Sequence, residues 1–235
     1  MKVLKKLFVA FLLFLTFLIG IYIKDDKLYY ISFGDGLSLG INENNYISYG
    51  YSDFIKDYLI KNNKLKFYTK NFSKQDIRIT DMINNINDNE FIDVDNKIIY
   101  IQSALNKADL ITISVGLNEI MYKFSNNTNT SYLYDYIDSY IDDMNKLIKL
   151  IKKYNNKKIF ILGYYTPKND KDLNKYMIYA NDKLINICNK EKVNYIDIYN
   201  IFKNRSYLIY NLNNYYPNKE GYKLISNEII KKLIK

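Results

Sequence analysis

Side chains able to do chemistry gather in short segments of the 235-residue chain that are punctuated by glycine. Ser38 stands two residues after Gly36 and close to Asp35, so a carboxylate could activate a hydroxyl nucleophile there. The alternative is structural: Ser38 would satisfy the backbone of a turn, and Asp35 would cap the segment that follows it. We expect the structural role for both residues.

Carboxylates and tyrosines form two further groups of candidates. Asp76, Asp81 and Glu119 could activate a water molecule, act as a glycosidase-like pair or bind a metal ion, or they could simply be solvated loop charges. Tyrosines are concentrated near the C-terminus, where they could stack on sugar rings: Tyr207, Tyr210, Tyr215, Tyr216 and Tyr222.

The sequence contains no histidine, which excludes Ser-His-Asp triads, Cys-His pairs and HExxH zinc sites. Cys188 is the only cysteine, so a disulfide framework and a cysteine-rich zinc site are excluded as well. We therefore expect no metal and no cofactor. If the protein is an enzyme, its base must be a carboxylate, a lysine or a tyrosine.

The formal net charge of +9 does not indicate a nucleic-acid-binding protein. Basic residues are scattered among acidic ones, and no zinc-finger spacing or RNA-recognition aromatic motif occurs. The abundance of Asn, Ile, Tyr and Lys is typical of A+T-rich coding sequence. We expect no nucleic-acid partner, and the basic surface fits an anionic lipid surface better.

The N-terminus has the pattern of an export signal. Lys2, Lys5 and Lys6 precede an apolar run from Leu7 to Ile23, after which Lys24 to Lys27 is charged. No small-residue cleavage site follows the run, so we expect residues 1–26 to be an uncleaved signal anchor that crosses the membrane as one helix. Residues 27–235 would then be an extracytoplasmic domain. The alternative is a cleaved signal peptide and a secreted protein.

The remainder of the chain alternates short strand patterns with longer helical ones. Strands are predicted at Leu28–Phe33, Leu65–Thr69, Leu110–Val115, Lys158–Leu162 and Val193–Ile198. Helices are predicted at Tyr51–Ile60, Ile79–Ile86, Ile98–Asn106, Tyr132–Tyr154, Leu173–Asn189 and Tyr222–Ile234. This alternation predicts a three-layer α/β/α fold with a central parallel five-stranded sheet.

Ligands of such sheets bind beyond the carboxyl ends of the strands. Four segments occupy that position: Asp35 to Ser38, Asp76 to Thr80, Gly116 to Glu119, and the loop from Asn211 to Pro217. We expect these segments to converge on one site.

In the same order, these segments resemble the sequence blocks of the SGNH or GDSL-type esterases and lipases. The first block is Gly34-Asp35-Gly36-Leu37-Ser38, and the third is Gly116-Leu117-Asn118-Glu119. The last block ends in Pro217-Asn218-Lys219-Glu220-Gly221-Tyr222, and the resemblance spans nearly all of the soluble part. It implies the flavodoxin-like fold of that family and an ester-hydrolase ancestry.

The catalytic positions differ from the family pattern. The resemblance implies that the nucleophilic serine, the histidine base and the aspartate that orients the base would stand at positions 36, 216 and 213. This chain has Gly36, Tyr216 and Asn213 there. Glycine offers no nucleophile, and an unperturbed phenol with a pKa near ~10 keeps its proton at neutral pH. Efficient ester hydrolysis by the family mechanism is therefore not expected.

The family's oxyanion hole is a separate matter. The resemblance implies that it would be formed by the backbone N–H groups of Gly36 and Asp76 and by the side-chain amide of Asn118. These donors do not need the triad, so a notch that binds a carbonyl group or an anion could persist without catalysis. Asn118 could equally be a residue that caps its loop.

Three functions follow as hypotheses. The first is a membrane-anchored pseudoenzyme that binds an acylated lipid or an acetyl-bearing glycan of the cell envelope. The second is an active hydrolase that uses Ser38 or a carboxylate-activated water molecule. The third is a structural or partner-binding module with a vestigial pocket. The oligomeric state cannot be predicted from the sequence.

Overall fold

The computed structural model describes residues 11, 26–126, 130–167, 170–209 and 215–234. Five parallel strands form the central sheet in the order β2-β1-β5-β6-β7. They are β1 (Leu28–Gly34), β2 (Leu65–Thr69), β5 (Leu110–Ser114), β6 (Lys158–Leu162) and β7 (Asn194–Ile196). Counted among the sheet strands alone, the order is 2-1-3-4-5, which is flavodoxin-like. Strand β5 is buried at every position, as a central parallel strand covered on both faces should be.

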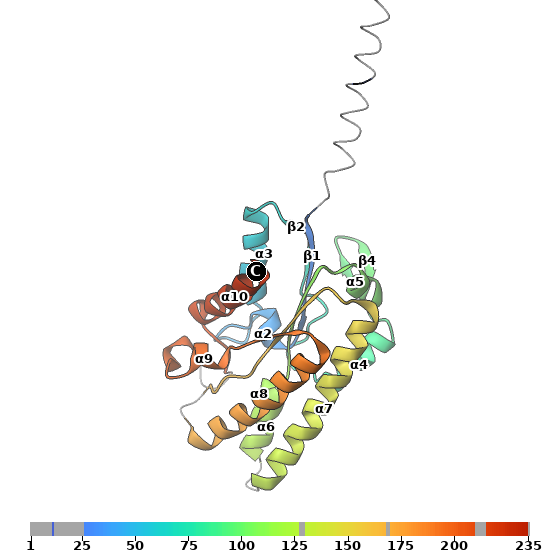
Figure 1. The fold of residues 1–235 in the computed structure, drawn as a ribbon. Coiled ribbons are helices and arrows are strands. Elements are labelled where there is room, and N and C mark those ends of the chain that lie inside the picture. Colours follow the sequence, from blue (N-terminus) through green and yellow to red (C-terminus); the bar gives the residue numbers. More distant parts are fainter. Residues whose placement is uncertain (1–10, 12–25, 127–129, 168–169, 210–214, 235) are drawn as a thin grey trace, which may run out of the picture.

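Helices cover both faces of this sheet, so the predicted three-layer fold is confirmed (Figure 1). On one face α3 (Tyr51–Lys61) packs against α10 (Lys219–Ile234). On the other, α4 (Ile79–Asn87), α5 (Ile101–Lys107), α7 (Thr130–Tyr154) and α8 (Lys171–Glu191) pack together. The three- and four-residue repeat of apolar residues in α7 is buried throughout: Leu133, Ile137, Ile141, Met144, Ile148 and Ile151.

One predicted helix is partly wrong. Ile98 to Tyr100 belong to β4 (Lys97–Tyr100), which pairs antiparallel with β3 (Phe91–Val94) in a separate hairpin, and the helix begins only at Ile101. Asp95 and Asn96, at the tip, have φ angles of 53° and 60°, the left-handed pair that a tight hairpin turn requires. The run of apolar residues from Ile98 onward suits a strand and a helix equally well, and the turn decides between them.

Several short helices near the carboxyl ends of the strands were not predicted from the sequence. They are α2 (Gly36–Leu39), α6 (Leu117–Asn126), α9 (Tyr199–Phe202) and the 3₁₀ turn η1 (Ser206–Leu208). Two of them, α2 and α6, begin within the predicted site segments and set the direction of their side chains.

The predicted membrane anchor lies outside the described residues, apart from Phe11 and Asp26. Within the part of the chain that the structure describes, no helix has both the length and the apolar character needed to cross a bilayer.

Candidate functional site

The predicted segments converge at the carboxyl ends of β1 and β5. Gly36 is the first residue of α2, and Asn118 lies in the first turn of α6. Tyr216 lies in the segment before α10, which begins at Lys219. Asp76 and Asn118 line two adjacent cavities of about 660 Å³ and 350 Å³, and Tyr216 lines the smaller one. We call these two cavities together the cleft.

Tyr216 fills the space that a side chain at position 36 would need. A Cβ atom on Gly36 would overlap the hydroxyl oxygen and the ring of Tyr216, and would also come within 2.9 Å of Ile41 Cγ1. The Tyr216 side chain is buried, with the residue only 4% exposed. Glycine at 36 and tyrosine at 216 are therefore two halves of one packing arrangement.

Two of the three predicted oxyanion-hole donors have partners inside the protein. Asn118 Nδ2 donates to Tyr216 Oη at 2.7 Å, and the Gly36 N–H donates to the Gln75 carbonyl at 3.1 Å. Burial raises the pKa of Tyr216 further above its usual value, and the nearby Asp35 charge adds to the effect. The phenol is thus held neutral, and it occupies the donor that a substrate carbonyl would use.

Asp35 has the capping role that the sequence predicts. Its Oδ1 accepts from the Leu37 N–H at 3.0 Å at the start of α2. The side chain is buried, and burial raises the pKa of Asp35 to about 7 despite this and other hydrogen bonds.

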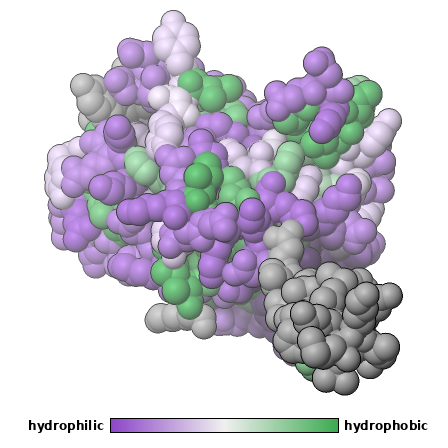
Figure 2. Space-filling model, turned by 90° about the horizontal axis from the view of Figure 1, so that it is seen from above, coloured by the Kyte–Doolittle hydropathy of each residue, from purple (hydrophilic) through white to green (hydrophobic). Residues whose placement is uncertain are grey.

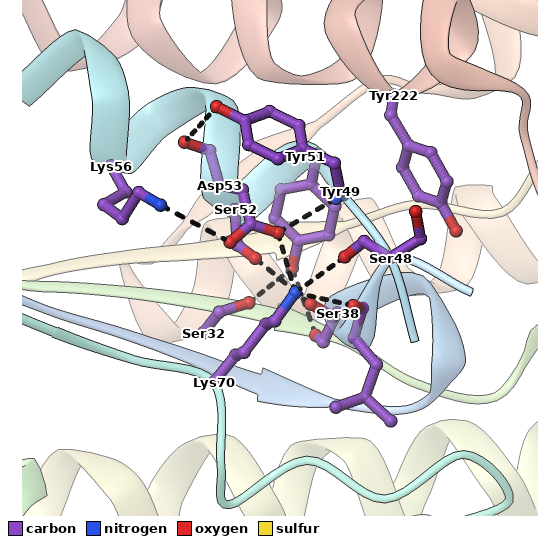
Figure 3. Close-up of polar contacts among 12 residues, drawn as sticks. Ser32, Ser38, Ser48, Tyr49, Tyr51, Ser52, Asp53, Lys56, Lys70 and Tyr222 are labelled. Atoms are coloured by element: carbon purple, nitrogen blue, oxygen red, sulfur yellow. Dashed lines mark hydrogen bonds and ion pairs between the residues drawn. The ribbon is translucent and has the colours of Figure 1, made fainter. Parts of the chain in front are cut away.

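Ser38 faces the interior and not the cleft. It is fully buried, and its Oγ is 2.8 Å from Ser114 Oγ and 3.1 Å from Tyr51 Oη. Figure 3 shows it packed against α3 beside Tyr51 and Ser32. Its surroundings fit the turn-stabilising role, and a substrate could reach it only if this packing opened.

An ion pair near Ser38 between the buried Asp53 and the partly buried Lys70 connects α3, the residue after β2 and the loop after α2 (Figure 3). Lys70 Nζ lies 2.7 Å from Asp53 Oδ2 and also donates to the carbonyls of Leu39 and Ser48, at 2.8 Å and 3.0 Å. Asp53 in turn accepts from the Gly50 N–H at 2.9 Å, which caps α3. This pair supports the segment on which Gly36 is carried. The ion pair was not predicted, because Asp53 and Lys70 belong to different segments of the chain and no sequence pattern links them.

The three candidate carboxylates do not form one group. Asp76 and Glu119 both line the larger cavity, whereas Asp81 pairs with Arg78 through two hydrogen bonds of 3.1 Å to the guanidinium group. Burial raises the pKa of Glu119, whose Oε1 accepts from Tyr136 Oη at 3.2 Å. Among the described residues, no three His, Cys, Asp or Glu side chains gather closely enough to hold a metal ion.

The predicted tyrosines are similarly divided. Tyr216 and Tyr222 are buried, Tyr215 is partly buried and lines the smaller cavity with Tyr216, and Tyr207 is exposed. Tyr210 lies outside the described residues together with Asn213. The tyrosines that line the larger cavity are instead Tyr122, Tyr136 and Tyr140, of which Tyr122 is 66% exposed. Tyr122 was not predicted because it lies on α6, which the sequence pattern did not indicate. Tyr136 and Tyr140 lie on α7, which was predicted, but the helical pattern does not show that they face the cleft.

The C-terminal motif has a structural explanation. Asn218 Oδ1 accepts from the Gly221 N–H at 2.9 Å and so caps the start of α10, and its Nδ2 donates to the Tyr207 carbonyl at 2.8 Å. Tyr222 Oη donates to the Ile41 carbonyl at 2.8 Å, which ties α10 to the loop after α2. These contacts fix the backbone that follows Pro217, and Tyr165 Oη donates to the Tyr215 carbonyl at 2.6 Å on the other side, so both flanks of Tyr216 are held in place.

Comparison with known proteins agrees with this fold and these motifs. A family description, GDSL-like Lipase/Acylhydrolase, matches residues 30–229. No curated protein matches the sequence.

Solved structures show the same fold at low identity. A lipase from a goat rumen metagenome superimposes with a TM-score of 0.74 at 17% identity, covering 86% of this chain and 95% of that one. An acetylxylan esterase from Geobacillus stearothermophilus gives a TM-score of 0.64 at 12% identity, covering 87% and 93%. An α/β hydrolase from the metagenome of Lake Arreo in Spain gives 0.60 at 14%, covering 86% and 93%.

Proposed function

Because the chain belongs to the GDSL-like lipase/acylhydrolase family, we propose that it is a catalytically impaired member that binds an acyl- or acetyl-bearing ligand in its cleft. We further propose that residues 1–26 anchor it in the cell membrane with the domain on the extracytoplasmic side. The observation that carries the proposal is the position of Tyr216. Its hydroxyl group occupies the space that a side chain at position 36 would need, and it accepts the hydrogen bond of the Asn118 amide.

The chemistry of these groups supports impairment. Gly36 carries no oxygen that could attack a carbonyl carbon. The raised pKa of Tyr216 keeps its proton in place at neutral pH, so it does not replace imidazole as a base. An ester carbonyl would have to displace Tyr216 before Asn118 could stabilise a negative charge on its oxygen.

The lining of the cleft supports a carbohydrate-like ligand. Polar side chains and tyrosine rings both line the larger cavity, including Asn118, Glu119, Tyr122 and Tyr136. A site that combines hydrogen-bonding groups with aromatic faces suits a sugar ring that carries hydroxyl and acetamido or acetyl groups.

Restoring the family residues tests the impairment. The full chain in detergent is compared with the triple variant Gly36→Ser, Asn213→Asp, Tyr216→His, using p-nitrophenyl acetate as substrate. We expect no turnover by the parent and measurable turnover by the triple variant, while Gly36→Ser alone stays inactive because the serine overlaps Tyr216. Turnover by the parent itself would contradict the proposal.

Ligand binding is tested separately with acetylated xylo-oligosaccharides and isothermal titration calorimetry. Removal of the exposed ring in Tyr122→Ala should weaken binding by about five- to thirtyfold, which corresponds to roughly 1–2 kcal/mol of lost contact. Tyr207→Ala is the matched control, because Tyr207 is 63% exposed and does not line the cleft. Equal effects of the two substitutions would contradict binding in the cleft.

A second candidate, hydrolysis by a carboxylate-activated water molecule, is favoured by one observation. Glu119 lines the larger cavity, and burial raises its pKa towards the range useful for proton transfer. If the parent turns over p-nitrophenyl acetate and Glu119→Gln abolishes that turnover, this candidate replaces the first.

A further inference from the structure

We propose that the end of the domain at which the strands begin contacts an anionic lipid bilayer, so that the cleft opens away from the membrane. We call this surface the amino-end face. The inference rests on the proposed membrane anchor and adds an orientation to it.

Exposed lysines collect on the amino-end face because the topology places helix ends and strand starts together. Lys61 and Lys107 are the last residues of α3 and α5, and Lys192 is the C-cap of α8. Lys64 and Lys157 directly precede β2 and β6. Each helix end alone would favour a cation. The fold brings these separate cations onto one surface, to which Asp109 and Asp26 contribute partners for Lys157 and Lys64.

Large apolar side chains are exposed on the same face. Ile60 in the last turn of α3 is 56% exposed, Ile98 on the hairpin 60%, and Ile234 at the end of α10 66%. Hydrogen bonds tie these helix ends to the strand starts: the Leu28 N–H donates to the Lys64 carbonyl at 2.7 Å, and Lys158 Nζ to the Leu233 carbonyl at 2.9 Å. Figure 2 looks onto this end and shows apolar patches separated by hydrophilic surface.

The outward face of the hairpin carries three large apolar or aromatic side chains. Phe91 is paired with Tyr100, and Asp93 with Ile98, so these four side chains share one side of the hairpin, and all are exposed. Figure 1 places the hairpin towards the end at which the chain enters β1. Apolar side chains next to lysines are the combination that binds the interface of an anionic membrane.

The length of the connection forces this face close to the bilayer. Only Lys24 to Lys27 separate the apolar run, which ends at Ile23, from Leu28 at the start of β1. Even when fully extended, these residues span at most about 14 Å. The start of β1 therefore lies within two Debye lengths, about 8–10 Å each, of the charged surface at physiological ionic strength.

The orientation restricts the ligand. The cleft lies at the opposite end of β1, whose seven residues span roughly 23 Å. A lipid held in the same bilayer could not reach it. The acyl or acetyl group that enters the cleft must belong to a polymer or a soluble molecule on the aqueous side, which favours an acetylated glycan over a membrane lipid.

Lipid-quenching fluorescence on the full chain tests the orientation. The chain is reconstituted in vesicles of phosphatidylcholine with phosphatidylglycerol, and Ile98→Cys is labelled with an environment-sensitive fluorophore. Tyr122→Cys is the matched control, since Tyr122 is equally exposed but lies at the cleft. The native Cys188 is buried and stays unlabelled. We expect brominated lipid to quench the label at position 98 at least about threefold more than the label at 122.

Charge reversal supplies a second readout. Lys64→Glu with Lys107→Glu should reduce quenching at position 98, whereas Lys146→Glu with Lys175→Glu, on α7 and α8, should leave it unchanged. Equal quenching at positions 98 and 122, or none at either in vesicles that carry the protein, would overturn the orientation and leave the anchor intact. Failure of the chain to float with the vesicles would overturn both.

Discussion

At the scale of single residues, the site is defined by how Gly36 and Tyr216 share one space. The order of the sequence blocks was enough to predict that Gly36, Asn118 and Tyr216 converge, because strand ends in a parallel sheet meet at one edge. It was not enough to predict that the Tyr216 hydroxyl would bond to Asn118, since that depends on the direction of a side chain across 98 positions of sequence. Of the three oxyanion-hole donors predicted from the resemblance, the Asn118 amide and the Gly36 N–H donate to partners within the protein.

The shared space makes a quantitative prediction. Gly36→Ala should lower the free energy of unfolding by about 1–3 kcal/mol, because the added methyl group overlaps the Tyr216 ring and hydroxyl. In the background Tyr216→Ser the same substitution should cost less than about 0.5 kcal/mol. Urea denaturation of the four proteins measures this coupling, and additive effects would show that the two positions do not compete.

Asp35 predicts a pH dependence of stability. Its folded-state pKa is raised to about 7 from a usual value of 3.8, so between these values the folded chain holds a proton that the unfolded chain has released. The stability contribution is fully present below about pH 4 and is lost as the pH rises to about 7, by up to about 4 kcal/mol.

The measurement is urea denaturation at several pH values. Asp35→Asn keeps an acceptor for the Leu37 N–H but cannot titrate, so its stability should change less between pH 4 and 7 than that of the parent. Parallel curves for the two proteins would show that Asp35 is not the titrating group.

At the scale of elements, Lys70 stabilises the segment that contains Gly36 by donating hydrogen bonds to two of the backbone carbonyls that follow it. This side chain is 15% exposed and bonds to atoms from α2, the following loop and α3. A four-residue helix is too short to be stable alone, and α2 is held by the Asp35 cap, by Gly40 at its other end and by the Lys70 contact to the Leu39 carbonyl.

Loss of this cation should be costly. Lys70→Met removes the positive charge next to Asp53 and the donor to two carbonyl groups, and we expect a loss of about 2–4 kcal/mol in the free energy of unfolding. Lys56→Met is the control: Lys56 lies 3.9 Å from Asp53 and is more exposed, so its loss should cost under about 1 kcal/mol. Equal losses in chemical denaturation would contradict a special role for Lys70.

The elements also show what a sequence alone can predict. All five sheet strands were predicted within a few residues. Strands β1, β5 and β6 are short runs rich in aliphatic and aromatic residues, whereas β2 and β7 have weaker patterns and were indicated by the alternation of strands and helices. The hairpin of β3 and β4 was missed, although the Asp95-Asn96 pair between two apolar runs was a usable signal for it. Helix α6 was missed because its polar and aromatic composition resembles a loop, and its stability comes from packing Leu117, Ile120 and Met121 into the core.

At the scale of the whole molecule, the cleft and the amino-end face lie at opposite ends of the sheet. Binding at one end should therefore be independent of what covers the other. The affinity for acetylated xylo-oligosaccharides should agree within about twofold between the full chain in detergent and the full chain in vesicles with its domain outside. A marked loss of affinity in vesicles, seen by calorimetry, would mean that the bilayer covers the cleft.

The overlap between position 36 and Tyr216 also limits how this site can change by mutation. A serine at 36 collides with the tyrosine, and exchanging the tyrosine alone exposes a glycine that has no hydroxyl to offer. Each single substitution towards a nucleophilic site therefore either lowers the stability of the fold or adds no catalytic group. Only a simultaneous change at positions 36 and 216 avoids both outcomes, so single substitutions are expected to leave the present pair in place.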